Sequence, residues 1–200
     1  MAISRAEADS ILAPFKPTIL EVISSAYDDY QTQYTQVSPI HTVRTQANIL
    51  RDHMVYHARR LFHEMDGVRI IEKAGLFLVE IQNTVILRFK KFDDDERTSN
   101  YPTDQAVDYL EQQELPWMPQ KATRLEVGYQ LNKLGTAFRA LIARPRGFGL
   151  DPAWVIDLLN LAAAEEAVEP GTQLELKIDK KKRVRVKSAP VKKVKEAKHE

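Results

Sequence analysis

Cysteine is absent from this chain of 200 residues, which excludes disulfide bonds and thiolate metal sites. No apolar run is long enough to span a bilayer, and the N-terminal residues lack the apolar stretch of a signal peptide. We therefore expect a cytoplasmic protein with no membrane partner. Hydrophobic residues make up 44% of the chain and charged residues 28%, which is typical of one globular domain with an apolar core.

Several nucleotide-binding and catalytic motifs are also missing. The sequence has no GxxxxGKS or GxxxxGKT loop and no GxGxxG, so nucleotide binding by those loops is unsupported. It has no GxSxG motif and no cysteine nucleophile, and no strand shows the aromatic pattern of an RNA-recognition sheet. We predict no cofactor on this basis.

Excess charge of one sign is absent overall, since the net charge is +1. The segment 177–200 alone carries +8, which leaves −7 on the rest of the chain. An acidic body does not favour a broad nucleic-acid surface, whereas a basic tail attracts DNA, RNA, an acidic partner or the body itself. We predict a domain over 1–170 and a flexible basic tail over 171–200. The tail cations expected to contact a polyanion are Lys180, Lys181, Lys182, Arg183, Arg185, Lys192 and Lys193.

Apolar spacing predicts helices in the first third of the chain. A helix over 4–33 is expected to break near Pro14 and Pro17, because proline removes a backbone donor and restrains the preceding residue. A second helix, over 43–65, follows Thr42, which can cap it.

Beyond residue 67 the apolar period changes to two, which predicts strands over 68–71, 76–82 and 85–92. A helix capped by Thr103 follows, and then a hairpin of strands over 124–131 and 138–143. Residues 154–166 fit either a strand or a helix, and 173–178 with 183–187 fit either a hairpin or disorder. We therefore predict an α+β fold: two N-terminal helices packed on a mainly antiparallel sheet of two hairpins, with an inserted helix and a basic C-terminal tail.

Two histidines on the second helix form the first candidate site. His53 and His57 are four residues apart, so both point to one helix face and could hold a metal. A third ligand would have to come from Asp52, His63 or His41. The sequence has no HExxH pattern, so the alternative is a polar helix face with His57 partly buried, and we predict no metal site.

A second candidate consists of Asp66, Glu80 and Gln82. Metal-dependent nucleases of the PD-(D/E)xK type hold their metal with an acidic residue and a strand-borne glutamate, followed by a lysine two residues later. Here Gln82 stands at the lysine position and cannot supply its positive charge. The alternative interpretation is a solvated sheet face.

The third candidate is the strand over 85–92. Alternation places Leu87 and Phe89 on one face and Arg88 and Lys90 on the other. Two cations fixed on a strand can bind a phosphate or a carboxylate, unless the acidic run 93–96 neutralises them. The predicted anion-binding or partner-binding residues are Arg88, Lys90, Lys91, Asn100 and Thr103.

From about residue 43 to about residue 154, the chain resembles a group of uncharacterised bacterial proteins. The resemblance rests on the stretches 52–55, 87–93, 99–105, 115–119, 124–131 and 135–136. Such proteins are encoded near Xre-type repressors and zinc metallopeptidases of the radiation-response type, which implies a toxin–antitoxin, prophage or phage-defence setting. The group has no assigned activity, so the resemblance implies no catalytic residue.

The leading functional hypothesis is a non-enzymatic binding component of such a cassette. It would contact a protein partner encoded nearby, and its tail would add contacts to DNA or RNA. The alternative hypothesis is a metal-dependent nuclease that uses Asp66 and Glu80. A nuclease needs carboxylates that converge in an exposed cleft, and a binding component does not.

Overall fold

The computed structural model describes residues 3–113 and 121–160. The chain divides into two units at about residue 168, and every described residue lies in the first. The seven predicted tail cations, the 173–178 and 183–187 segments and the proline-containing segment 115–119 lie outside the described residues.

The N-terminal helices follow the predicted pattern. Helix α1 (Arg5–Leu12) begins at a capping box, in which the Ser4 hydroxyl accepts from the Glu7 amide and the Glu7 carboxylate accepts from the Ser4 amide. A 3₁₀ turn (Ala13–Phe15) contains Pro14 and connects α1 to α2 (Lys16–Gln33), so the predicted break is confirmed. No helix in the described ranges is both long and apolar enough to cross a membrane.

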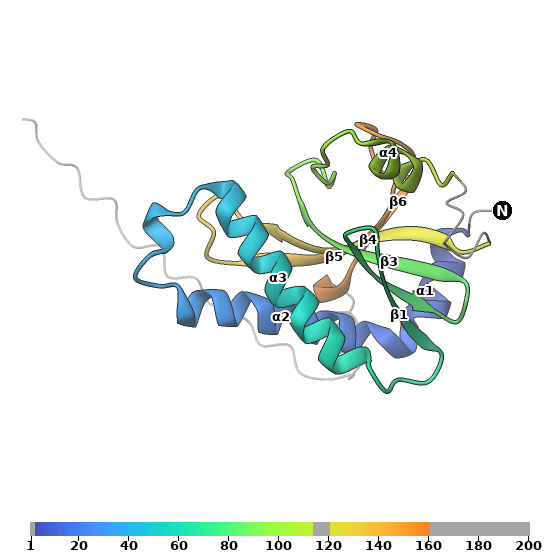
Figure 1. The fold of residues 1–200 in the computed structure, drawn as a ribbon, viewed down its shortest axis with the longest axis horizontal. Helices are drawn as coiled ribbons and strands as arrows, with labels where there is room; N and C mark the ends of the chain where they lie inside the picture. The colour runs from blue at the N-terminus through green and yellow to red at the C-terminus, as the bar shows by residue number, and fades with distance from the viewer. Residues whose placement is uncertain (1–2, 114–120, 161–200) are drawn as a thin grey trace, which may run out of the picture. The chain divides into compact units, whose positions relative to one another are not determined.

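Helix α3 (Val43–Phe62) follows a short 3₁₀ turn (Ser38–Ile40). The Thr42 hydroxyl accepts from the Thr45 amide at 3.1 Å, which confirms the predicted cap. Helices α2 and α3 pack side by side against one face of the sheet (Figure 1).

Six strands form one sheet in the order β1-β2-β3-β4-β5-β6. All neighbours are antiparallel except β3 and β4, which are parallel and are connected through α4 (Asp104–Leu110). The α+β class and the mainly antiparallel sheet are therefore confirmed. The strand bounds are β1 Val68–Lys73, β2 Leu76–Ile81, β3 Val85–Phe92, β4 Thr123–Leu131, β5 Phe138–Arg144 and β6 Trp154–Asp157.

The sequence left open whether the segment that begins at residue 154 is a strand or a helix, and the structure shows a strand, β6, at its start. Residues Trp154–Asp157 pair with β5, and residues 158–160 then turn into a helix at the end of the described range. Residues 154–157 form a strand and not a helix because β-branched and aromatic residues favour strands. Ile156 packs in the main core, and Val155 packs on the opposite face.

The two faces of the sheet are covered by different helices. Helices α1–α3 pack on the face that carries Val79, Leu87 and Val127, and this interface forms the main core. Helix α4 packs on the opposite face, where Tyr109 and Leu110 contact a smaller apolar cluster (Figure 1).

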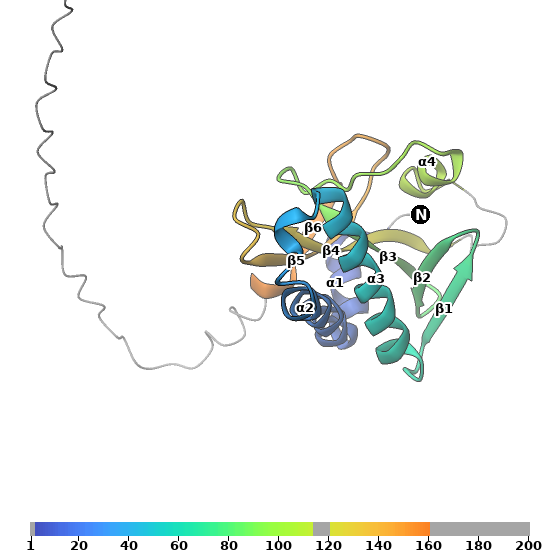
Figure 2. The same cartoon turned by 60° about the vertical axis from the view of Figure 1, so that its left-hand side comes forward.

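The β1–β2 hairpin separates from β3 along part of its length, and this separation positions the candidate site. Strands β1 and β2 pair over their full length, but β2 pairs with β3 only over residues 79–81. Residues 88–91 of β3 thus have no partner strand on the side of β2 within the described sheet. Figure 2 shows the hairpin at one edge of the sheet, beside α3.

Candidate functional site

Arg88 and Lys90 lie on the α4 side of β3, as predicted. Their neighbours Leu87 and Phe89 are buried in the main core on the other side. In the parallel register Arg88 lies beside Glu126 of β4, and Lys90 lies beside Gly128. The alternation that the sequence suggested is therefore confirmed for this strand.

A cleft of about 260 Å³ opens where β2 leaves β3. Helix α3 and the start of β2 contribute to its walls, and β3 contributes side chains from both of its faces. The residues that line this cleft, which we call the β3-edge cleft, are Arg51, Val55, Gly75, Leu76, Phe77, Arg88, Phe89 and Lys90.

A tight turn forms one wall of the β3-edge cleft. Lys73 pairs with Leu76, so the loop between them consists of Ala74 and Gly75. Both loop residues have positive φ, 52° and 75°, which is the backbone of a two-residue turn that matches strand twist. The turn keeps the hairpin short and places Leu76 and Phe77 at the cleft.

Gly128 allows β4 to approach the backbone of Lys90 on β3 closely. A Cβ atom at position 128 would be 1.8 Å from the Lys90 carbonyl oxygen, so any side chain there would force β4 away from β3. Glycine therefore permits the close approach that holds the backbone of Lys90 in place.

The Arg88 guanidinium lies over the ring of Tyr109, with its Cζ atom 5.3 Å from the ring centroid. The Tyr109 ring is itself fixed, because its hydroxyl donates to the Leu125 carbonyl at 2.9 Å. Arg88 Nη1 is buried and has no hydrogen-bond partner among the described residues. A buried donor without a partner is costly, so Arg88 carries an uncompensated donor next to the cleft.

Lys90 is half-buried beside these groups. Burial is the main cause that lowers the pKa of Lys90 to about 8, and the nearby charges of Arg88 and Arg51 lower it further. Glu126 acts in the opposite direction but does not compensate. Within the ranges that the structure describes, neither Arg88 nor Lys90 takes part in an ion pair.

Among the described residues, Glu126 is the carboxylate that lies beside the two cations. It is 3% exposed and accepts from the Thr98 hydroxyl at 2.5 Å and from the Asn100 amide at 3.5 Å. Burial raises the pKa of Glu126, whereas the Thr98 hydrogen bond and the charges of Arg88 and Lys90 lower it. One carboxylate beside Arg88 and Lys90 leaves this pair with surplus positive charge, whereas Arg51 on the wall of the cleft pairs with Asp52.

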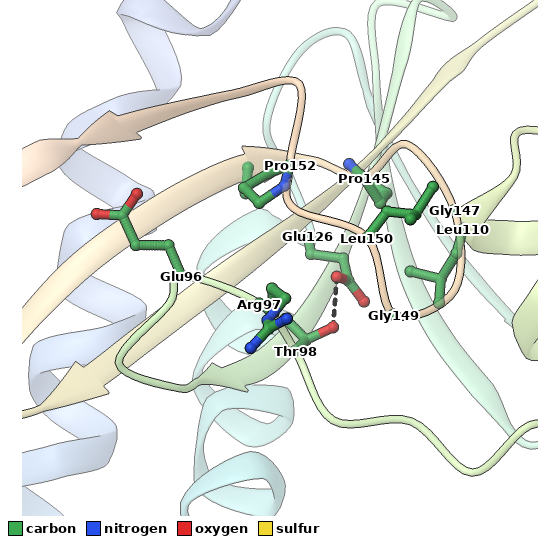
Figure 3. A pocket seen from close by; sticks show the side chains of 11 residues that line it. Glu96, Arg97, Thr98, Leu110, Glu126, Pro145, Gly147, Gly149, Leu150 and Pro152 are labelled. Atoms are coloured by element: carbon green, nitrogen blue, oxygen red, sulfur yellow. Dashed lines mark hydrogen bonds between the residues drawn. The ribbon is translucent and has the colours of Figure 1, made fainter.

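A second cavity lies between the 96–98 segment and the 145–152 loop. Figure 3 shows the Glu126 side chain on its wall, hydrogen-bonded to Thr98. Its volume is about 30 Å³, which is the share of one water molecule in the liquid. We therefore treat it as part of the support of Glu126 and not as a ligand site.

The acidic run that the sequence offered as a partner for Arg88 and Lys90 pairs elsewhere. Asp93 and Asp95 pair with Arg97, and Glu96 pairs with Arg139 at 2.9 Å. These ion pairs stabilise the loop after β3, and none of them involves Arg88 or Lys90.

The remaining predicted anion-binding residues are divided by the structure. Asn100 reaches Glu126 and belongs to the cluster. Lys91 follows the strand alternation to the face opposite Lys90 and does not line the cleft. Thr103 caps α4, where its hydroxyl accepts from the Ala106 amide at 3.3 Å.

The residues of the nuclease hypothesis do not gather in a cleft. Glu80 is 1% exposed and pairs with Arg69 at 2.5 Å across β1 and β2. Asp66 is exposed ahead of β1, and Gln82 is exposed in the next turn with a φ of 49°. Among the described residues neither Asp66 nor Glu80 belongs to a group of three potential metal ligands, so the structure adds no support to this hypothesis.

The two candidate histidines meet a residue that sequence reasoning missed. Asp29 of α2 lies 2.7 Å from His57 Nε2 and 3.2 Å from His53 Nδ1, both measured from its Oδ2 atom. Asp29 follows Ala26 by three residues and Val22 by seven, so the helical period places it beside the buried stripe of α2, although only the tertiary packing shows that α3 is its neighbour.

The other suggested third ligands lie elsewhere. His41 Nδ1 is 2.9 Å from the Tyr30 hydroxyl, Asp52 pairs with Arg51, and His63 is exposed just after α3. Comparison with protein-family models, curated proteins and solved structures finds no match to this chain.

Proposed function

We propose that the protein is a non-enzymatic binding component that holds an acidic segment of a partner protein in the β3-edge cleft. One observation carries the proposal: Arg51, Arg88 and Lys90 line a single cleft, and the latter two have no ion-pair partner among the described residues. Buried cations are normally paired, and unpaired ones are a signature of a binding site.

The open edge of β3 supports a peptide as the ligand. Residues 88–91 leave backbone donors and acceptors without a strand on the side of β2. An extended segment can add to such an edge through main-chain hydrogen bonds, while its carboxylates meet the cations. Backbone pairing would give affinity, and the charges would give specificity.

The size and walls of the cleft agree with this ligand. Val55, Leu76, Phe77 and Phe89 offer apolar contacts next to the three cations. The cleft of about 260 Å³ is smaller than most small-molecule pockets, which have roughly 300–1,000 Å³. It suits one or two side chains of a segment that continues along the strand edge.

The biological setting of the proposal comes from the sequence resemblance. The resemblance implies a toxin–antitoxin, prophage or phage-defence cassette, in which the partner protein would be encoded nearby. In that setting the basic residues after residue 177 would add contacts to DNA or RNA, so the protein would connect an acidic partner to a nucleic acid.

The test compares two changes on one strand in the full-length chain. A fluorescent polyglutamate peptide and a labelled single-stranded DNA are titrated into wild type, R88Q/K90Q and K91Q. We expect the double variant to bind the peptide at least about tenfold more weakly, since each contact to a charged group contributes about 1.5–3 kcal/mol. K91Q removes one cation from the other face, and it should bind like wild type.

Melting curves of the same variants complete the test. Unchanged peptide affinity together with a lower melting temperature for R88Q/K90Q would show that the pair is structural and would end the proposal. A selective loss of DNA affinity would identify the ligand as a nucleic-acid phosphate and not a peptide. Because the basic tail is identical in all three proteins, it cannot account for a difference between them.

A further inference from the structure

A second cluster of functional groups lies between α2 and α3 and does not depend on the proposed cleft. Each of Asp29, His53 and His57 offers one ligand atom, and these atoms all lie within 4.8 Å of one another. We propose that these three side chains form a zinc site that fastens α2 to α3.

The helices hold the three donors rigidly. His53 and His57 are one helical turn apart on α3, so both rings project towards α2. Their neighbours Met54 and Ala58 are fully buried in the main core, as is Ala26 on α2 beside Asp29. Donors on packed helices keep their spacing better than donors on loops.

Two of the three donor spacings are close to those of a tetrahedral zinc centre, and the third, between the two imidazole nitrogens, is within 4.8 Å. Zinc bonds of about 2.0–2.1 Å place neighbouring ligand atoms about 3.3 Å apart. The 3.2 Å between Asp29 Oδ2 and His53 Nδ1 already matches this value. The 2.7 Å between Asp29 Oδ2 and His57 Nε2 has to widen by about half an ångström, which a small carboxylate rotation can provide.

The chemistry of the donors also suits zinc. Two imidazoles and one carboxylate are a common zinc set, and three protein ligands leave a fourth position for water or a partner side chain. Asp29 Oδ2 already lies within hydrogen-bond distance of one nitrogen of each ring, so one carboxylate oxygen is directed between the two imidazoles. Without metal the ring N–H groups donate to Asp29; with metal each ring carries its proton on the other nitrogen.

An ion can enter from solvent on the Asp29 side. The Asp29 side chain is 32% exposed and that of His53 is 17%, whereas that of His57 is 9% exposed and forms the floor. The ring of Tyr34 stands edge-on to His53, with centroids 5.9 Å apart, and shields one side of the site. The arrangement is a partly open site and not a sealed one.

Zinc binding to the untagged full-length chain tests the inference. After chelator treatment and dialysis, zinc chloride is titrated calorimetrically, and Co²⁺ is added separately because its visible absorption reports tetrahedral coordination. We expect one ion per chain and a melting temperature that rises with zinc concentration, since an ion that binds only the folded state stabilises it. No heat, no melting shift and no Co²⁺ absorption would overturn the site.

Variants separate this site from chance binding by surface histidines. D29N and H53A should each weaken zinc binding at least about tenfold, as the loss of one of three ligands requires, whereas H63A should leave it unchanged. Equal losses in H53A and H63A would assign the binding to exposed histidines and refute the site. The Co²⁺ spectrum is taken on variants whose circular dichroism matches wild type, and H57Q is a further variant should one of them unfold.

Discussion

The sheet face covered by α1–α3 and the face covered by α4 differ in what they bury. The first buries mainly apolar side chains, with Val79, Leu87 and Val127 among its fully buried residues. The second buries charged and amide groups between two small apolar clusters, and these groups are Glu80, Arg124, Glu126 and Gln130. The first face therefore contributes most of the apolar burial, and the second buries most of the charged and amide groups.

Within the second face, paired and unpaired groups are distinguishable. Glu80 pairs with Arg69, Arg124 donates to the Asp108 carbonyl at 3.1 Å, and Gln130 accepts from Arg139 at 2.8 Å. These partners account for most of the buried polarity. Glu80 Oε1 and Arg124 Nε each remain without a partner, but Arg88 and Lys90 at the open edge of β3 have neither an ion pair nor a side-chain hydrogen bond among the described residues, and this contrast distinguishes them as a candidate site.

The largest expected effect belongs to the apolar face. Leu87→Ala removes a fully buried side chain from the main core, and we expect the free energy of unfolding to fall by about 2–5 kcal/mol. Urea denaturation measures the change. A loss below about 1 kcal/mol, the range of conservative core swaps, would show that this face is not the stabilising one.

A smaller loss is expected for Glu126→Gln on the opposite face. The change removes the carboxylate that lies beside Arg88 and Lys90, and leaving buried charges without compensation costs about 1–3 kcal/mol. Because Glu126 raises the pKa of Lys90, the same change should lower that pKa below about 8, which NMR titration of the lysine side chain would detect. An unchanged Lys90 pKa would mean that the two groups do not interact.

Thr103→Ala tests a residue that the sequence grouped with the anion site. The structure uses the Thr103 hydroxyl to cap α4, so its loss should cost about 1 kcal/mol and should not change peptide affinity. Thermal melting and the peptide titration are run on the same sample. Weaker peptide binding without a stability loss would return Thr103 to the binding site.

Local rules predicted the elements and part of the site. The period of two placed Arg88 and Lys90 on one face of a strand, and the Thr42 and Thr103 caps were readable because capping depends on neighbouring residues. The alternation also placed Lys91 away from them, although its cation had been grouped with theirs.

Long-range packing determined the rest. Nothing local in β2 shows that its residues 76–78 are separated from β3, because strand separation depends on the twist of the hairpin and on α3 beside it. Sequence reasoning missed Asp29 for the same reason. It is 24 residues from His53, and only the packing of α2 on α3 brings the two side chains together. Sequence reasoning identified no third ligand, and the prediction of no metal site rested on that gap.

The last effect in the comparison concerns Lys90 and carries a distinctive pH dependence. Burial lowers the pKa of Lys90 to about 8, while a lysine in the unfolded chain titrates near 10.4. Below pH 8 both states hold the proton, so the full cost of a buried cation is present. Between the two values the unfolded chain binds more protons, so the stability of wild type rises with pH.

Lys90→Met removes this cation and should therefore be more stable than wild type below pH 8. The difference should shrink as the pH rises through the window between about 8 and 10.4. Lys91→Met is the matched control, because it removes a neighbouring cation from the other face. Urea denaturation of the three proteins at several pH values measures the differences.

The peptide titration decides what the stability difference means. A bound carboxylate favours the charged amine, so the affinity of wild type should fall as the pH rises through about 8, whereas Lys90→Met should bind weakly throughout. A residue that weakens the fold and strengthens binding is typical of a functional site, since selection tolerates its cost only for function. If Lys90→Met is less stable than wild type at every pH, Lys90 supports the fold and the contrast within this face disappears.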